Sequence, residues 1–230
     1  MNPILLAMPL RGRGWALPKV ADGLAGLDTK GLSVKAYFRF EGPANHGFVE
    51  RVADAHPEWL PLFASEPEPT VRVGRPWKAE GYRHMATVRD RLLAEARFWG
   101  ASMFSVDSDI VVRPDTLKRL ISHNKPIVSA LVRNHAQAQA YNMMMFDGTR
   151  FTRRGIDRDL HGSGLLSCSL TGACYLIDRS VVWDRDVRYV PDKQGEDAGF
   201  CRTATAAGFS IFCDTDSPVA HLMAPGVELS

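Results

Sequence analysis

Two aspartates separated by one residue, Asp107 and Asp109, follow the apolar run of residues 102–106. This run predicts a buried strand, and side chains two residues apart in an extended strand lie on the same face. Two carboxylates that share a face repel each other unless a cation or hydrogen-bond donors offset their charge. Hard cations such as Mg²⁺ and Mn²⁺ bind carboxylate and phosphate oxygen, which favours a metal–diphosphate site at the end of a strand, where open α/β sheets bind ligands. A solvated turn is the alternative, because D-x-D arises often by chance.

Glu196 and Asp197 open a predicted helix over residues 196–206, and His221 follows an apolar run near the end of the sequence. A helix start stabilises ionised carboxylates, so Asp197 is expected to be charged at neutral pH. The two acidic residues fit either a catalytic carboxylate or a simple interaction with the helix dipole. His221 fits either a metal ligand or a core histidine.

The elements that position these residues alternate between strand and helix through the first 132 residues. The alternation predicts a mostly parallel sheet flanked by helices, an α/β fold. From residue 134 onward the pattern changes to a small mixed or antiparallel part, with a hairpin around Asp147-Gly148. The predicted strands lie at residues 2–10, 32–40, 70–73, 102–106, 127–132 and 209–213, and the predicted helices at 15–27, 48–60, 84–98, 114–121 and 196–206.

The composition is that of a globular protein. The chain has 230 residues, 45% of them hydrophobic, which lies near the usual 45–50% or so and excludes a disordered chain or a coiled coil. Its 28 Lys and Arg exceed its 26 Asp and Glu by only two, too few to predict bulk electrostatic capture of nucleic acid. The four cysteines have no zinc or CxxC spacing and are expected to be buried free thiols. With no run of about 18 apolar residues and no signal peptide, the sequence predicts a cytoplasmic protein without a transmembrane segment.

The order of the motifs resembles that of the GT-A fold glycosyltransferases, especially the inverting family-2 type. The pieces that carry the resemblance are AMPLRGR (7–13), the D-x-D segment (88–114), SLTGACYLIDR (169–179), the G-E-D segment (195–214) and VAHL (219–222). The resemblance implies one GT-A (Rossmann-like) catalytic domain over residues 1–230. Its nucleotide-binding half would be residues 1–133, and its acceptor-binding and catalytic half residues 134–230.

The resemblance also implies a role for each matching residue. Asp109 would bind the metal directly, Asp107 would face the ribose or the metal, and His221 would complete the coordination of Mn²⁺ or Mg²⁺. Asp197 would be the catalytic base, with Glu196 and Gly172 binding the acceptor. The remaining donor contacts would come from Pro9, Leu10, Arg11, Arg89 and Ser108.

The predicted reaction is the metal-dependent transfer of one sugar, a hexose or a pentose, from a nucleotide-diphosphate sugar to an acceptor hydroxyl with inversion. No Q-x-x-R-W motif follows His221, which favours a single transfer over polymerisation. One alternative is a nucleotidyltransferase acting on a sugar phosphate, although residues 11–14 (RGRG) match its glycine-rich loop only weakly and no lysine follows until Lys19. The other is a non-catalytic nucleotide- or glycan-binding module. The acceptor stays open among a glycan, a protein, a lipid head group and a modified nucleic-acid base.

Overall fold

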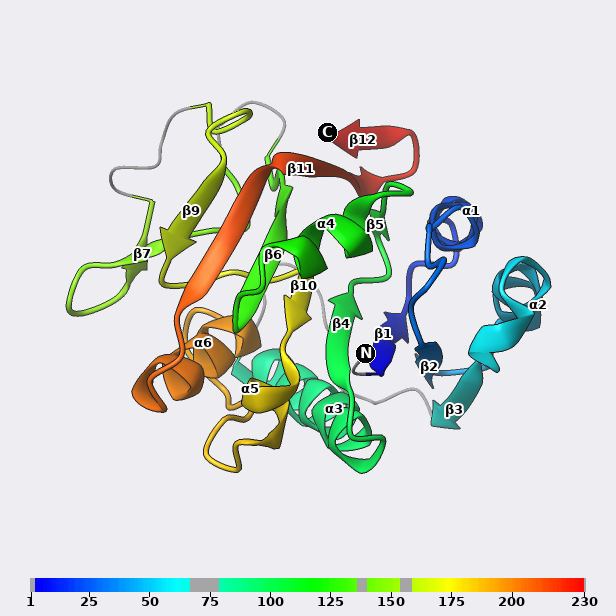
Figure 1. Ribbon diagram of the computed structural model, residues 1–230, viewed down its shortest axis with the longest axis horizontal. Coiled ribbons are helices and arrows are strands. Elements are labelled where there is room, and N and C mark those ends of the chain that lie inside the picture. Colours follow the sequence, from blue (N-terminus) through cyan, green and yellow to red (C-terminus); the bar gives the residue numbers. More distant parts are fainter. Residues whose placement is uncertain (1–2, 67–78, 136–139, 154–158, 230) are drawn as a thin grey trace.

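The computed structural model describes residues 3–66, 79–135, 140–153 and 159–229. They form an α/β fold around a ten-stranded sheet with the main strand order β12-β11-β6-β10-β4-β1-β2-β3, which Figure 1 shows with helices on both faces. The strands of this sheet are β1 (Ile4–Arg11), β2 (Val34–Glu41), β3 (Leu62–Glu66), β4 (Ser102–Val106), β5 (Ile110–Val111), β6 (Ile127–Val132), β9 (Leu165–Cys168), β10 (Cys174–Ile177), β11 (Ile211–Ala224) and β12 (Val227–Leu229).

Four neighbouring strands of the sheet, in the order β4-β1-β2-β3, are parallel, as predicted. β1 pairs in parallel with β2 and β4, β2 with β3, and β11 with β6. β10 is antiparallel to both of its neighbours, β4 and β6. A separate antiparallel pair, β7 (Met145–Phe146) and β8 (Phe151–Thr152), forms the predicted hairpin around Asp147-Gly148.

Two hydrophobic cores lie on the two faces of the sheet because side chains alternate along each strand. In β1, Leu6 and Met8 point into one core, whereas Leu5 and Ala7 point into the other. The first core is covered by α1 (Leu17–Ala25), α2 (His46–Ala55) and α4 (Thr116–Ser122). The second is covered by α3 (Ala79–Phe98), α5 (Arg179–Trp183) and α6 (Glu196–Ala206). A short 3₁₀ helix, η1 (Pro57–Trp59), follows α2.

The strands β4 and β6 and the helix α6 have the bounds that the sequence predicts. The third strand is different: β3 occupies residues 62–66, where the sequence predicts no strand, and the predicted strand at 70–73 lies outside the described residues. The last predicted strand is too short. β11 continues past Pro218 to residue 224 because a register shift between Asp214 and Pro218 accommodates the proline.

The two predicted halves of the chain share one sheet, since β10 from the second half lies between β4 and β6 of the first. The division at residues 133 and 134 stays a prediction. The four cysteines are buried and free, as predicted. None of the helices in the described parts of the chain is long and apolar enough to span a bilayer.

Candidate active site

The predicted site residues gather at the carboxyl end of the parallel strands. Arg11 at the end of β1 lies opposite Glu41 at the end of β2. The antiparallel strand β10 starts at this same end, where Cys174 pairs with Val106 of β4. The turn before β10 and the first turn of α6 therefore come next to the residues that follow β4.

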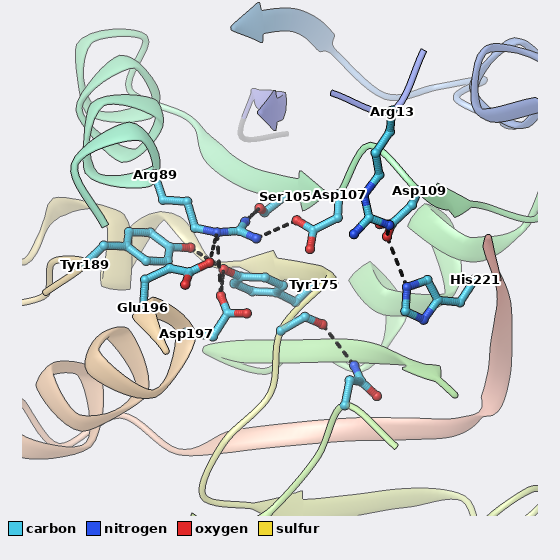
Figure 2. Close-up of polar contacts among 12 residues, drawn as sticks. Arg13, Arg89, Ser105, Asp107, Asp109, Tyr175, Tyr189, Glu196, Asp197 and His221 are labelled. Atoms are coloured by element: carbon cyan, nitrogen blue, oxygen red, sulfur yellow. Dashed lines mark hydrogen bonds and ion pairs between the residues drawn. The ribbon is translucent and has the colours of Figure 1, made fainter. Parts of the chain in front are cut away.

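Asp107 and Asp109 do not share a face, which corrects the prediction from the extended-strand spacing. β4 ends at Val106, and the chain then turns, with the Ile110 amide donating to the Asp107 carbonyl at 3.1 Å. In this turn the Asp107 carboxylate points toward Arg89, whereas the Asp109 carboxylate points toward His221 (Figure 2). Ser108, between them, is buried. The repulsion expected between the two carboxylates is thus reduced, because the guanidinium of Arg89 pairs with Asp107 and that of Arg13 pairs with Asp109.

Arg89 on α3 joins the acidic residues of β4 and α6. Its side chain is 3% exposed, and its guanidinium donates to Asp107 Oδ1 at 2.5 Å, Glu196 Oε1 at 3.1 Å and Ser105 Oγ at 3.3 Å. Its Nε lies 3.8 Å from Asp197 Oδ1. Burial alone would lower the pKa of Arg89, but the surrounding carboxylates raise it well above the usual value. Arg89 is therefore a permanent buried cation whose nitrogens face protein carboxylates, and its predicted contact with the donor stays a prediction.

Asp197 has an environment that opposes its charge. Dense packing around the carboxylate removes most of its hydration and raises its pKa to about 7, although a quarter of the side-chain surface stays exposed. Arg89 lowers this pKa, the nearby charges of Glu196 and Asp107 raise it, and a hydrogen bond from Tyr175 lowers it. Loss of hydration therefore works against the charged form of Asp197 that the helix start was expected to favour. A carboxylate with a pKa near the working pH suits a general base.

Two buried tyrosines lie beside Asp197, and the hydroxyl of one of them, Tyr175, contacts its carboxylate. Tyr175 of β10 donates to Asp197 Oδ1 at 3.2 Å, and the Tyr189 hydroxyl is hydrogen-bonded to that of Tyr175 (Figure 2). Sequence reasoning missed both residues. Tyr175 stands in an apolar strand where an aromatic side chain indicates core packing, and no local pattern shows where its hydroxyl points.

Gly172 packs directly against Asp197. A Cβ atom at residue 172 would overlap Asp197 Oδ2 and lie 2.7 Å from its Cγ. The Gly172 carbonyl accepts a hydrogen bond from Asn142 Nδ2 at 2.9 Å, and Asn142 is itself bonded to the backbone of Ala130 and Val132 in β6. The turn before β10 is thus fixed to the sheet, and the missing side chain at residue 172 leaves room for the carboxylate. Glu196, also predicted to bind the acceptor, is buried against Arg89.

Asp109 and His221 form a second cluster of polar side chains in the site, apart from the carboxylates around Arg89. His221 Nε2 lies 3.1 Å from Asp109 Oδ2, and His221 Nδ1 lies 2.9 Å from the carbonyl oxygen of Arg133. Only a protonated Nδ1 can donate to a carbonyl, so in neutral His221 the lone pair is on Nε2 and faces the carboxylate. A positive charge must offset that contact, and here Arg13 supplies one to Asp109.

Asp109 and His221 are the two side chains at this site that could hold a divalent cation. Metal-bound histidines commonly donate their second nitrogen to a carbonyl, and Mg²⁺ often takes one or two protein ligands with the rest from phosphates and water. Among the described residues no three His, Cys, Asp or Glu side chains lie close enough to form a larger metal centre. Asp109 and His221 could thus supply two ligands to such an ion, while Asp107 is bound to Arg89.

A pocket of about 230 Å³ lies beside this pair, where β1 and β2 end. Leu10 and Arg11 line it, as do Arg13 and Glu41. Arg11 Nε lies 3.5 Å from Glu41 Oε2. Pro9, also predicted to contact the donor, is buried within β1 and does not line the pocket. Arg13 borders the pocket and contacts Asp109, so it connects the pocket to the candidate metal ligands.

The order of the strands and this arrangement of the site define a GT-A-like α/β fold. No known family model matches the chain. Solved structures of S. aureus TarS are similar over 95% of this chain at 14% sequence identity. They are residues 1–349 of TarS alone (TM-score 0.58), the same fragment with UDP-GlcNAc (0.57) and the same fragment with UDP (0.57). This chain spans 57–59% of those fragments and 36% of a longer TarS structure. At this identity the similarity establishes the fold.

Proposed function

We propose that this chain is a glycosyltransferase that moves one sugar from a nucleotide-diphosphate sugar to an acceptor hydroxyl, with inversion. The observation that carries the proposal is the environment of Asp197. Its carboxylate has a pKa of about 7 and lies at the carboxyl end of a GT-A-like sheet, linked by Arg89 to the turn that bears Asp109. An acceptor hydroxyl is a weak nucleophile, and a positioned base with such a pKa speeds its attack by about 10²–10⁴-fold.

In the proposed reaction Asp197 accepts the proton of the acceptor hydroxyl as that oxygen attacks the anomeric carbon. One in-line displacement then inverts the configuration and releases the nucleoside diphosphate. Gly172 and Tyr175 hold the carboxylate, and Arg89 offsets the negative charge of Asp107, Glu196 and Asp197. The fixed position of the base supports a single orientation of the acceptor.

Asp109 and His221 would hold Mn²⁺ or Mg²⁺, and a bound divalent cation would stabilise the negative charge that develops on the departing diphosphate. Arg13 contacts the same carboxylate and lies on the side of the pocket at the ends of β1 and β2. It can add a second positive charge to a diphosphate bound there.

The pocket beside Asp109 supports a nucleotide as the ligand at this end of the sheet. TarS binds UDP and UDP-GlcNAc, so uridine-diphosphate sugars are the first donors to test. The sugar is a hexose or a pentose, and the acceptor is a glycan, a protein, a lipid head group or a modified nucleic-acid base.

The experiment that tests the proposal measures binding and turnover with a panel of UDP-, GDP-, dTDP- and CMP-sugars in Mn²⁺ or Mg²⁺. We expect one nucleotide to raise the melting temperature through binding and the matching sugar to be transferred, or slowly hydrolysed, with release of the nucleoside phosphate. Asp197→Asn should still bind the nucleotide but lose at least about 10²-fold in rate.

Three results would contradict the proposal. Release of pyrophosphate from a nucleoside triphosphate and a sugar phosphate would identify a nucleotidyltransferase. Tight nucleotide-sugar binding without turnover under any condition would indicate a binding module. Full activity in Asp197→Asn would remove the proposed base.

A further inference from the structure

We propose that Tyr189 and Tyr175 form a directed hydrogen-bond chain that holds the carboxylate of Asp197 ready to accept a proton. Both tyrosines are then positioning residues for the reaction. The inference rests on the proposed function only in taking Asp197 as the base. The contacts themselves lie in the described core of the protein, between β10, the segment before α6 and α6 itself (Figure 2).

The direction of donation along these hydrogen bonds follows from the number of hydroxyl protons available. A phenol has one hydroxyl proton to donate. When Asp197 is ionised it accepts from the Tyr175 hydroxyl, 3.2 Å from Oδ1, so the proton in the contact between the two tyrosines must come from Tyr189. Tyr189 therefore donates to Tyr175, and Tyr175 donates to Asp197. A protonated Asp197 no longer needs this donation, so the chain stabilises the ionised form in particular.

Both hydroxyls keep their protons over the range in which Asp197 titrates. Burial raises the pKa of Tyr175 and of Tyr189 well above the usual value, and the neighbouring carboxylate of Asp197 raises that of Tyr175 further. Neither tyrosine competes with Asp197 as a proton acceptor. They are lasting donors.

The backbone and ring of Tyr189 are fixed independently of its hydroxyl. Its amide donates to Asp90 Oδ1 of α3 at 3.1 Å, and its ring stacks on Phe200 of α6 with centroids 4.6 Å apart. Phe200 and Asp197 both belong to α6, so the ring of Tyr189 packs against the same helix that carries the base. A Tyr-to-Phe change at either position keeps the ring and removes only the hydroxyl.

The charged groups around Asp197 make this neutral donor necessary. Arg89 of α3 faces Asp197 Oδ1, but at 3.8 Å, and its Nε is hydrogen-bonded to Glu196. Glu196, beside Asp197 on α6, and Asp107, after β4, both add negative charge. Tyr175 is thus the group that donates to Oδ1 at hydrogen-bonding distance among those described here. It favours the ionised carboxylate without attracting the other acids.

The test measures the carboxyl of Asp197 directly by NMR, with ¹³C-labelled aspartate and the signal assigned by its loss in Asp197→Asn. In Tyr175→Phe we expect the carboxyl to titrate at a pH higher by about 0.5–1 unit than in the wild type, since a donor to the ionised form is gone. In Tyr189→Phe the change should have the same direction and be smaller. Tyr141→Phe is the matched control, because the Tyr141 hydroxyl donates to Asp159 and takes no part in the hydrogen bonds between Tyr189, Tyr175 and Asp197.

A second measurement follows the pH dependence of transfer. The acid limb of kcat should move to higher pH in Tyr175→Phe, with the donor KM unchanged and part of the rate recovered above the new pKa. An unchanged Asp197 titration in both Tyr175→Phe and Tyr189→Phe would overturn the inference, and should Tyr175→Phe fail to fold, Tyr189→Phe decides alone. Because the NMR titration needs no turnover, absence of transfer by the wild type would count against the proposed function and leave this inference to its own result.

Discussion

The side chain of Asp197 fills the space that a side chain at Gly172 would occupy. A Cβ atom at residue 172 would overlap Oδ2 and come within 2.7 Å of Cγ. On its other oxygen, Oδ1, Asp197 accepts from Tyr175. The carboxylate is therefore held between a glycine of the turn before β10 and a tyrosine of β10 itself, and both constraints come from a segment that is bonded to β6 through Asn142.

Gly172→Ala should lower transfer without loss of donor binding. The added methyl group must displace the carboxylate of Asp197, and a shift of about 1 Å at a reacting group can cost about 10²-fold in rate. Steady-state kinetics and a calorimetric donor titration measure the two effects separately. Gly47→Ala is the control, because a Cβ there meets its nearest neighbour at an ordinary 3.7 Å in α2. Wild-type kcat in Gly172→Ala would show that the contact does not position the base.

Asp197→Asn should make the protein more stable than the wild type at pH 8. The folded-state pKa of about 7 lies above the unfolded value near 3.9, so the native state loses stability as the pH rises from about 4 through 7. Asparagine keeps the shape and removes this penalty. The melting temperature of the variant should exceed that of the wild type at pH 8 and approach it at pH 5. Each kcal/mol of difference in the free energy of unfolding corresponds to a shift of about 2–4 °C. A difference that is the same at both pH values would contradict the raised pKa.

The fold could be predicted from the sequence because its strands are buried on both faces. β4 and β6 are buried along their whole length and are mostly apolar, as strands between two helical layers must be, and their bounds followed from those apolar residues. β3 is half-exposed at its apolar positions Leu62 and Phe63 and has an edge position beside β2, so it gives no such signal. The predicted strand at 209–213 stopped short because a proline such as Pro218 normally indicates the end of a strand, whereas β11 continues past it through a register shift.

The site could be predicted only as a set of residue types. The sequence indicated Asp109, His221 and Asp197 through the order of the motifs, and the structure brings the first two together. It did not indicate that Asp107 turns away, because that depends on where β4 ends. Nor did it indicate the Tyr175 contact or the raised pKa of Asp197, since both depend on packing between segments far apart in the sequence.

Arg89→Met should destabilise the protein far more than the loss of an exposed ion pair. Removal of this cation leaves Asp107 and Glu196 without their guanidinium, and breaking a buried charge network costs about 3–5 kcal/mol. Urea unfolding measures the change in the free energy of unfolding. Arg113→Met is the matched control: its pair with Asp115 is about half exposed on both sides and should contribute at most about 1 kcal/mol. Equal losses in the two variants would mean that Arg89 is not the partner of these carboxylates.

The two aspartates of the D-x-D segment should differ in their importance for metal binding. Asp109 lies against His221, whereas Asp107 is bound to Arg89, so Mn²⁺ affinity in the presence of nucleotide should fall at least about tenfold in Asp109→Asn and much less in Asp107→Asn. Electron paramagnetic resonance of free Mn²⁺ measures this affinity without any turnover.

His221→Ala should resemble Asp109→Asn, and His161→Ala, on the exposed surface beside Tyr141, should leave binding unchanged. Arg13→Ala should tighten Mn²⁺ binding in the absence of nucleotide, because the guanidinium that contacts Asp109 no longer competes with the ion. Equal losses in Asp107→Asn and Asp109→Asn would instead show that the turn rearranges so that both carboxylates bind the metal.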